Sequence, residues 1–240
     1  MKLVAAQTIP KDGDIAANLA DHCRLATEAA DKGARLIVFP EMSLTGYMLE
    51  EASKNAFTVN DARLEPLRDI AEYKNITIIA GAPIRTDNKL FIGAFIIHPD
   101  KPIGIYTKQY LHLGSEHFPD GEATFYESSF DYNPLLQLEG ERISIAICAD
   151  ISNPKHAEAA SQQNTSLYIA GIFYTPKSIA EGHNDLSRYA ATYNMNILMA
   201  NYGGASYKYD TGGISAAWNN KGELIAQLDS TGEGLLLVEL

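Results

Sequence analysis

Cysteine, tryptophan and long apolar runs are all scarce in this sequence of 240 residues. It contains two cysteines, Cys23 and Cys148, and one tryptophan. The cysteines are far apart and lack C-x-x-C or Cys/His ligand spacing, which argues against a disulfide framework and against a zinc site. The apolar run at the start is too short for a signal peptide, and no other is long enough to cross a bilayer. We therefore expect a cytoplasmic protein with reduced thiols.

Basic residues are also few, with 19 Lys and Arg against 30 Asp and Glu, for a formal charge of -11. This balance disfavours nucleic acid and anionic membranes as partners. The charges form no block, which is typical of a solvated acidic surface. Hydrophobic residues make up 46% of the chain, enough for a sizeable core. Since no linker or repeat divides the sequence, we expect one domain over residues 1–240.

Predicted helices alternate with strands that are apolar on both faces, which indicates sheets covered by helices. Hairpin-like stretches argue against a purely parallel sheet. Two mixed sheets packed face to face fit this pattern, and so does an open three-layer sheet, because periodicity alone does not separate them. The expected helices span 14–33, 61–74, 154–163 and 177–193, with a loop over 111–133. The expected strands span 2–7, 35–39, 76–84, 89–98, 101–108, 135–139, 142–148, 166–171, 196–201, 212–218, 223–228 and 234–240.

Three reactive side chains each follow an apolar strand, namely Glu41, Lys108 and Cys148. Ligands gather at the carboxyl ends of strands in open α/β folds, so these three side chains are candidates to converge. The combination is chemically coherent. A thiol with an ordinary pKa of ~8.5 needs a base to become a nucleophile, which a carboxylate supplies. A lysine beside them can stabilise the charge that develops on a carbonyl oxygen.

Three segments around these residues resemble the signatures of the nitrilase superfamily of carbon-nitrogen hydrolases. They are "FPEMSLTGY" at 39–47, "YTKQYL" at 106–111 and "ICADISNP" at 147–154, in the order and at about the spacing of that family. The resemblance runs from the strand at 2–7 to "GGISAAWNNKGELIAQL" at 212–228. It implies an α/β fold with mixed sheets in a four-layer α-β-β-α sandwich, paired into homodimers or larger homo-oligomers. It implies no metal and no organic cofactor.

The same resemblance implies a catalytic triad. Glu41 would be the general base, Lys108 would stabilise the oxyanion together with the backbone N–H of Ala149, and Cys148 would be the nucleophile that forms a thioester. We predict that Glu41 is partly desolvated, because a carboxylate beside an ammonium otherwise stays too acidic to act as a base near neutral pH.

Other site residues follow from the resemblance and from the surrounding sequence. A second glutamate of the family, which positions substrate and steadies the lysine, matches Glu116 in "SEHFPDGE", although Glu122 lies nearby. Tyr47 and Phe173 are candidates to line a substrate pocket, as are Tyr174 and Trp218, but aromatic residues in such positions are more often core. Cys23, on a predicted helix, is interpreted as a small buried hydrophobe.

A Cys-His-Asp system is the competing interpretation of Cys148, with Asp150 as the third member and His156 or His183 as the base. Two residues along an extended segment, Asp150 would not face the cysteine side chain. A local hydrogen-bonding role at the helix start at Pro154 is favoured instead. His112 and His117 lack the spacing of a metal pair and are interpreted as surface or substrate-loop residues.

The substrate predicted from these patterns is a small amide. Nitrile-cleaving members of the family tend to carry glutamate two residues after the cysteine, whereas Asp150 resembles the amide-cleaving branches. "RYAATYNMN" departs from the family pattern Arg-Ala-x-Glu-Asn at Tyr189, Thr192 and Tyr193, which leaves substrate recognition open. The alternatives are a nitrilase, an acyltransferase using the same triad, and a catalytically silent binding protein on the same scaffold.

Overall fold

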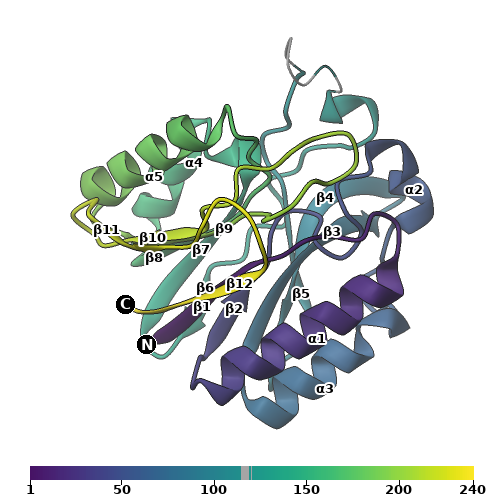
Figure 1. The fold of residues 1–240 in the computed structure, drawn as a ribbon, viewed down its shortest axis with the longest axis horizontal. Helices are drawn as coiled ribbons and strands as arrows, with labels where there is room; N and C mark the ends of the chain where they lie inside the picture. The colour runs from purple at the N-terminus through teal and green to yellow at the C-terminus, as the bar shows by residue number, and fades with distance from the viewer. Residues whose placement is uncertain (115–118, 120) are drawn as a thin grey trace.

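Two six-stranded mixed sheets form the centre of the protein (Figure 1). The computed structural model describes residues 1–114, 119 and 121–240. The strands of the first sheet are β1 (Lys2–Gln7), β2 (Leu36–Val38), β3 (Thr77–Thr86), β4 (Lys89–Ile97), β5 (Gly104–Thr107) and β12 (Gly234–Glu239). Their order is β12-β1-β2-β3-β4-β5. β1, β2 and β3 are parallel, and every other pair in this sheet is antiparallel.

The second sheet repeats this plan. Its strands are β6 (Leu136–Leu138), β7 (Glu141–Ile147), β8 (Leu167–Gly171), β9 (Asn196–Ala200), β10 (Ala216–Trp218) and β11 (Leu224–Gln227). Their order is β11-β10-β9-β8-β7-β6. β7, β8 and β9 are parallel, and the outer pairs are antiparallel. The hairpin expected near Pro99 is confirmed by the antiparallel pairing of β4 with β5.

Helices cover the outer face of each sheet. The longer ones are α1 (Ile15–Asp31), α3 (Glu65–Lys74), α4 (Pro154–Gln162) and α5 (Ile179–Tyr193). In Figure 1, α1 and α3 lie together on one side of the molecule and α4 and α5 on the other. One buried cluster lies between the two sheets. A second cluster lies between the first sheet and its helices, and a third lies between the second sheet and its helices. The four-layer α-β-β-α sandwich is therefore confirmed, and the open three-layer sheet is not found.

Local sequence explains where the helices begin. The Asp14 side chain accepts a hydrogen bond from the Ala17 nitrogen at the start of α1, over 3.0 Å. Asn153 accepts one from the Lys155 nitrogen at the start of α4, where Pro154 occupies the first turn. Such caps satisfy N–H groups that the helix leaves unpaired, and proline is well suited to the first turn because its missing N–H costs nothing there.

Short helices were the elements missed by sequence patterns. They are η1 (Leu49–Glu51), α2 (Ala52–Asn55), η3 (Glu122–Thr124) and η4 (Cys148–Asp150). The short η2 (Ala62–Leu64) directly precedes α3 and lies within the helix expected over 61–74. The strand expected over 212–218 is also shorter, because β10 begins at Ala216. Elements of one turn lack enough residues to show a hydrophobic period, and contacts with the rest of the fold decide them.

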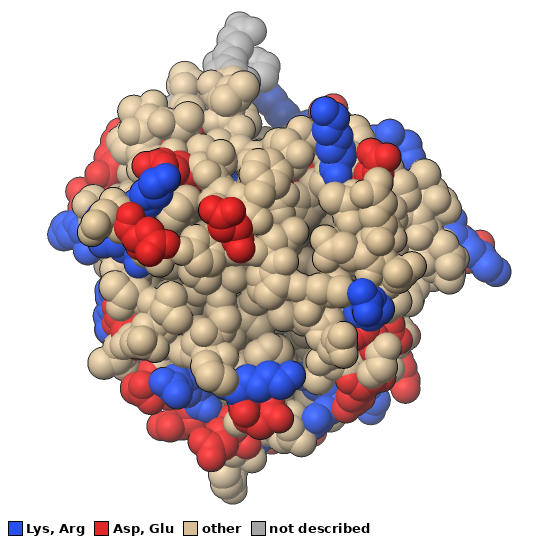
Figure 2. All heavy atoms as spheres, turned by 180° about the vertical axis from the view of Figure 1, so that it is seen from behind, with Lys and Arg blue, Asp and Glu red and all other residues tan. Residues whose placement is uncertain are grey.

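The charge pattern agrees with the scattered acidic surface expected from composition. Acidic and basic side chains are interspersed around the edge of the face in Figure 2, so the visible basic residues that the structure describes form no continuous band there. Among the described residues, no helix has the length and apolar character needed to cross a membrane.

Candidate active site

The three reactive residues at strand ends come together between the two sheets. Glu41 lies beyond β2 and Lys108 directly follows β5, both in the first sheet, whereas Cys148 directly follows β7 of the second sheet. The Lys108 Nζ atom is 2.7 Å from Glu41 Oε1 and 2.7 Å from Glu122 Oε1. Cys148 lines the same pocket as Glu122. The expected convergence of strand ends is therefore found.

Close backbone packing holds Glu41 in place. A Cβ atom at Gly81 would lie 2.4 Å from the carbonyl oxygen before Glu41 and 2.5 Å from the nitrogen after it. A Cβ atom at Gly171, on the second sheet, would lie 2.8 Å from the carbonyl oxygen of Phe39. The Tyr202 hydroxyl donates a hydrogen bond to the Glu41 carbonyl oxygen over 2.5 Å. Glycine is required at both positions because any larger residue would displace the chain that carries the carboxylate.

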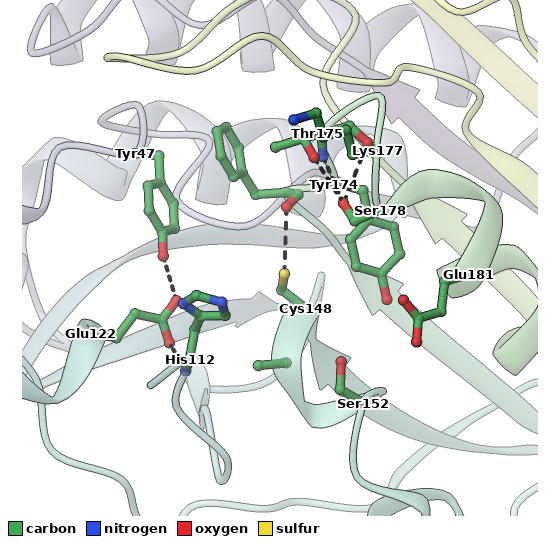
Figure 3. Close-up of a pocket in the computed structure, with 12 residues that line it drawn as sticks. Tyr47, His112, Glu122, Cys148, Ser152, Tyr174, Thr175, Lys177, Ser178 and Glu181 are labelled. Atoms are coloured by element: carbon green, nitrogen blue, oxygen red, sulfur yellow. Dashed lines mark hydrogen bonds between the residues drawn. The ribbon is translucent and has the colours of Figure 1, made fainter. Parts of the chain in front are cut away.

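Cys148 sits at a sharp turn from strand to helix. Its φ is 42°, in the left-handed region that non-glycine residues rarely adopt. β7 ends at Ile147 and η4 begins at Cys148. The thiol donates to the carbonyl oxygen of Phe173 over 3.5 Å, as Figure 3 shows. Backbone strain of this kind, of about 1 to 2 kcal/mol, persists where the surrounding structure enforces it and is common at functional sites.

Glu122 is the second carboxylate beside the lysine. Besides Lys108, it accepts hydrogen bonds from the Tyr47 hydroxyl and, over 2.7 Å, from the His112 backbone nitrogen. Glu116, which the sequence comparison favoured for this role, lies outside the residues that the structure describes. The sequence offered Glu122 as a nearby alternative. Only the three-dimensional structure shows that η3 places the Glu122 carboxylate beside the lysine.

Burial and charge set the protonation of this cluster. Burial, opposed by the charge of Lys108, raises the pKa of Glu41 to about 7. Burial alone would lower the pKa of Lys108, but Glu122 and Glu41 raise it, so the ammonium is retained. Burial and the charge of Glu41 raise the pKa of the Cys148 thiol well above its ordinary value. The resting site thus holds a protonated thiol beside a carboxyl group able to act as a base near neutral pH. The predicted desolvation of Glu41, which is 1% exposed, is confirmed.

The two carboxylate oxygens of Glu41 differ in their hydrogen bonding. Within the described ranges, Glu41 Oε2 is buried and has no hydrogen-bond partner, whereas Oε1 is held by Lys108. The interaction of the Cys148 thiol with this carboxyl lowers the pKa of Glu41. A buried acceptor without a donor is costly, and it is an acceptor ready to take a proton.

Asp150 has a structural role, but not at the helix start where it was expected. Its Oδ1 atom accepts from the backbone nitrogens of Gln109 and Tyr110, over 3.0 and 2.9 Å. Its Oδ2 atom accepts from the Ile147 nitrogen over 2.9 Å and from the Tyr106 hydroxyl over 2.6 Å. One buried carboxylate thereby joins the segments that carry the lysine and the cysteine. Asn153 caps the helix instead.

The histidines do not form a Cys-His-Asp system. His156 bonds the hydroxyls of Tyr106 and Tyr168, over 2.9 and 2.7 Å, and packs in the core. His183 contacts the carbonyl oxygen of Ile214 over 3.1 Å, and burial lowers its pKa. His112 lines the pocket, and His117 lies outside the described residues. In the part of the chain that is described, no three His, Cys, Asp or Glu residues are grouped to hold a metal ion.

A pocket of about 360 Å³ opens above the thiol (Figure 3). Tyr47 and Phe173, both predicted to line it, do so with their rings stacked at 4.5 Å. Ala149 and Tyr174 line it too. Trp218 lies in the core between the second sheet and its helices. The pocket is therefore aromatic on one wall and polar at its floor.

The atypical segment on α5 reaches the site indirectly. The Tyr189 hydroxyl donates to the Ile151 carbonyl oxygen over 2.8 Å, which ties α5 to the turn after Cys148. Thr192 is exposed and Tyr193 is partly buried near the end of α5. Where the family pattern has other polar residues, this chain uses a tyrosine to brace the turn.

Two curated relatives illustrate the range of similar sequences. The chain is 26% identical over 246 residues to the glutamine-dependent NAD(+) synthetase of Mycobacterium tuberculosis, an alignment that covers 93% of this chain. The chain spans only 36% of the length of that synthetase. It is 24% identical over 276 residues to the arylacetonitrilase of Hypocrea virens, covering 100% of this chain and 83% of the nitrilase.

Solved structures show the same fold. The NitN amidase from Nesterenkonia sp. AN1 matches with a TM-score of 0.88 at 22% identity, covering 100% of this chain and 92% of that one. The glutamine-dependent NAD+ synthetase from Acinetobacter baumannii matches with a TM-score of 0.86 at 23% identity, covering 98% and 44%. Residues 3–240 match the family model for carbon-nitrogen hydrolases. The chain therefore belongs to the carbon-nitrogen hydrolase family, a family of enzymes, as its three sequence signatures indicated.

Proposed function

We propose that this protein hydrolyses the C–N bond of a small amide through a thioester on Cys148. The observation that carries the proposal is the arrangement of Lys108, whose Nζ atom lies 2.7 Å from one oxygen of Glu41 while the other Glu41 oxygen is unpartnered among the described residues. The lysine ammonium orients the carboxyl, and the free oxygen is available to the thiol proton. A silent scaffold would not need that costly free acceptor.

In the first half of the reaction, Glu41 takes the proton of the Cys148 thiol as the sulfur attacks the amide carbon. The charge that develops on the carbonyl oxygen is stabilised by the Lys108 ammonium and the backbone N–H of Ala149. One such donor typically contributes ~2.7 to 4 kcal/mol to the transition state. Glu41 then returns the proton to the departing amine, the C–N bond breaks, and the acyl group remains on sulfur.

In the second half, water releases the acyl group. Glu41, again ionised, removes a proton from a water molecule that attacks the thioester carbon, and the proton returns to the sulfur as the carboxylic acid leaves. Glu122 also pairs with Lys108, over 2.7 Å, so the ammonium keeps its place through both halves. The residues named use no metal or organic cofactor.

Two features support an amide over a nitrile. Asp150 stands two residues after the cysteine, as in the amide-cleaving branches that the sequence resembles. The NitN amidase, whose structures include one with butyramide and one with acrylamide added to the active-site cysteine, has the same fold. A homodimer or larger homo-oligomer and a cytoplasmic location are proposed from the sequence alone, and light scattering of the purified protein tests the former.

An ammonia-release screen tests the function. The panel contains short aliphatic amides, ω-amides, N-carbamoyl compounds and nitriles, each incubated with the wild-type protein, Cys148→Ala and Cys23→Ala. We expect release from at least one amide, complete loss in Cys148→Ala and no change in Cys23→Ala. Added hydroxylamine separates hydrolysis from acyl transfer, since an acyltransferase would form the hydroxamate in preference to the acid. Activity that survives in Cys148→Ala would overturn the mechanism.

A further inference from the structure

The mouth of the pocket carries two opposite charges that the catalytic steps do not use. Lys177 and Glu181 both line the pocket. Lys177 precedes α5, and Glu181 is in its first turn, four residues later. Both side chains are exposed. The spacing would allow an ion pair between them, yet neither forms an ion pair or a side-chain hydrogen bond with any residue that the structure describes.

Two hydroxyl groups face the same space. Figure 3 shows the Glu181 carboxylate, the Tyr174 hydroxyl and the Ser152 hydroxyl directed toward one part of the pocket, across from Cys148. Tyr174 is 7% exposed, and its hydroxyl has no hydrogen-bond partner among residues 1–114, 119 and 121–240. Because Tyr174 lines the pocket, its hydroxyl is available there to bond a ligand. The Ser152 hydroxyl is likewise unpartnered within that set.

We propose that this mouth binds the zwitterionic end of an ω-amide of an α-amino acid, an inference that rests on the proposed function. Glu181, with the hydroxyls of Tyr174 and Ser152, binds the α-ammonium group, and Lys177 binds the α-carboxylate. A ligand with both charges on one carbon offers a partner to each of these two opposite charges, which line the same pocket on residues four apart in the sequence. An amide with one charge would satisfy only one of them, and an uncharged amide would satisfy neither.

The alternative role of Glu181 is structural, because a negative charge at the amino end of α5 stabilises the helix. That role would make Glu181 matter for stability and leave substrate preference unchanged. It also gives no role to the Tyr174 hydroxyl, which is directed toward the same part of the pocket as Glu181. The two interpretations therefore differ in a measurable way.

Four amides that share one carbon chain test the inference. They are L-glutamine, which has both charges; 4-aminobutanamide, which lacks the carboxylate; glutaric acid monoamide, which lacks the ammonium; and butanamide, which lacks both. The measured quantity is kcat/KM for ammonia release. For the wild-type protein we expect glutamine to be the best substrate, with a loss of about tenfold for each charge removed, the scale of one charge-assisted hydrogen bond.

Two variants assign the charges to residues. Glu181→Gln should lower kcat/KM about tenfold for the two amides that carry an ammonium and leave the other two unchanged. Lys177→Met should do the same for the two amides that carry a carboxylate. Glu158→Gln, an exposed glutamate on α4 outside the pocket, is the matched control and should change none of the four. Unfolding temperatures of all three variants should equal that of the wild-type protein.

Each other outcome overturns the inference. If butanamide is hydrolysed as well as glutamine, or if the preference for glutamine survives both variants, the mouth is not the binding site proposed and the amidase function still stands. If none of the four amides releases ammonia, the zwitterionic class is wrong. The broader screen then decides separately whether the protein is an amide hydrolase.

Discussion

The lysine behind the floor of the pocket and the lysine at its mouth differ in burial and in ion pairing. Lys108, buried behind the pocket-lining Glu122 at what we call the floor, is 0% exposed and forms ion pairs with Glu41 and Glu122. Lys177, at the mouth, is exposed and has no ion-pair partner in the described chain. Burying a charge without a partner is expensive, so the three charges at the floor depend on one another. At the mouth, water solvates each charge alone.

The difference implies that the two sets of residues determine different properties of the protein. Residues at the floor cannot change singly without leaving a buried charge or an orphaned acceptor, so the fold and the chemistry are coupled there. Residues at the mouth can change without cost to folding, which leaves substrate preference free to vary on a constant scaffold.

The largest effect is expected from the nucleophile. Cys148→Ala should lower kcat by at least about 10⁴-fold, because removal of the nucleophile leaves only the catalysis due to binding and oxyanion stabilisation. Cys23→Ala, the matched control on α1, should leave kcat unchanged. Steady-state ammonia release measures both. Equal losses in the two variants would show that neither thiol reacts and that the loss reflects folding.

The two lysines provide the sharpest test of the comparison. Lys108→Met should lower the free energy of unfolding by about 3 to 5 kcal/mol, since it leaves two buried carboxylates without a counter-charge. It should also lower kcat by about 10² to 10³-fold through loss of the oxyanion donor. Lys177→Met should change neither quantity for an uncharged amide. Denaturant unfolding and ammonia release measure the two effects. Similar unfolding curves for both variants would contradict the distinction between floor and mouth.

The Asp150 carboxylate accepts hydrogen bonds from backbone groups of the segments that carry Lys108 and Cys148. Asp150→Asn places an NH₂ group against donors, so we expect a loss of about 1 to 3 kcal/mol in stability from the unsatisfied groups. A fall in kcat of about tenfold or more should follow, because both catalytic segments are released. Tyr106→Phe removes one of the four donors and should cost less. Full stability and activity in Asp150→Asn would show that the carboxylate does not hold these segments.

The pH profile tests the role of Glu41 without any substitution, and close to neutral pH its effect is the smallest of the four. Glu41 must be ionised to accept the thiol proton, and its pKa is raised to about 7. The value of kcat/KM should therefore fall about tenfold per unit as the pH drops below 7. Above pH 7 it should level off, since the pKa of Cys148 is raised well above its ordinary value. Glu41→Gln should be slow and lack this acid limb. A wild-type profile that is flat from pH 5 to 8 would argue against Glu41 as the base.

Much of this architecture could be predicted from the sequence. The strand patterns located nearly every sheet strand, and the three signatures marked Glu41, Lys108 and Cys148 as a group. Such patterns succeed because long buried elements repeat one local rule over many residues. The left-handed turn at Cys148 and the glycine contacts of Glu41 were not predictable, because a hydrophobic period specifies neither a single backbone angle nor contacts between segments distant in sequence.

The sequence did not predict the position of Glu122 beside the lysine or the charged residues at the mouth, for a different reason. Glu116 and Glu122 both fall in the sequence segment 111–133, which has no periodic pattern, so the sequence does not say which carboxylate lies beside a lysine. The hydrogen bonds from Tyr47 and His112 to Glu122 exist only in three dimensions. Likewise, Lys177 and Glu181 read as ordinary surface charges until the pocket is seen between them and the thiol.

The most direct test is to identify the covalent intermediate. The best amide found in the screen is mixed with the wild-type protein, quenched in acid during turnover, and analysed by intact mass and peptide mapping. We predict a mass increase equal to the amide less ammonia, located on Cys148, absent in Cys148→Ala and retained in Cys23→Ala. Turnover with no acyl group on Cys148, or with the group on another residue, would contradict the account.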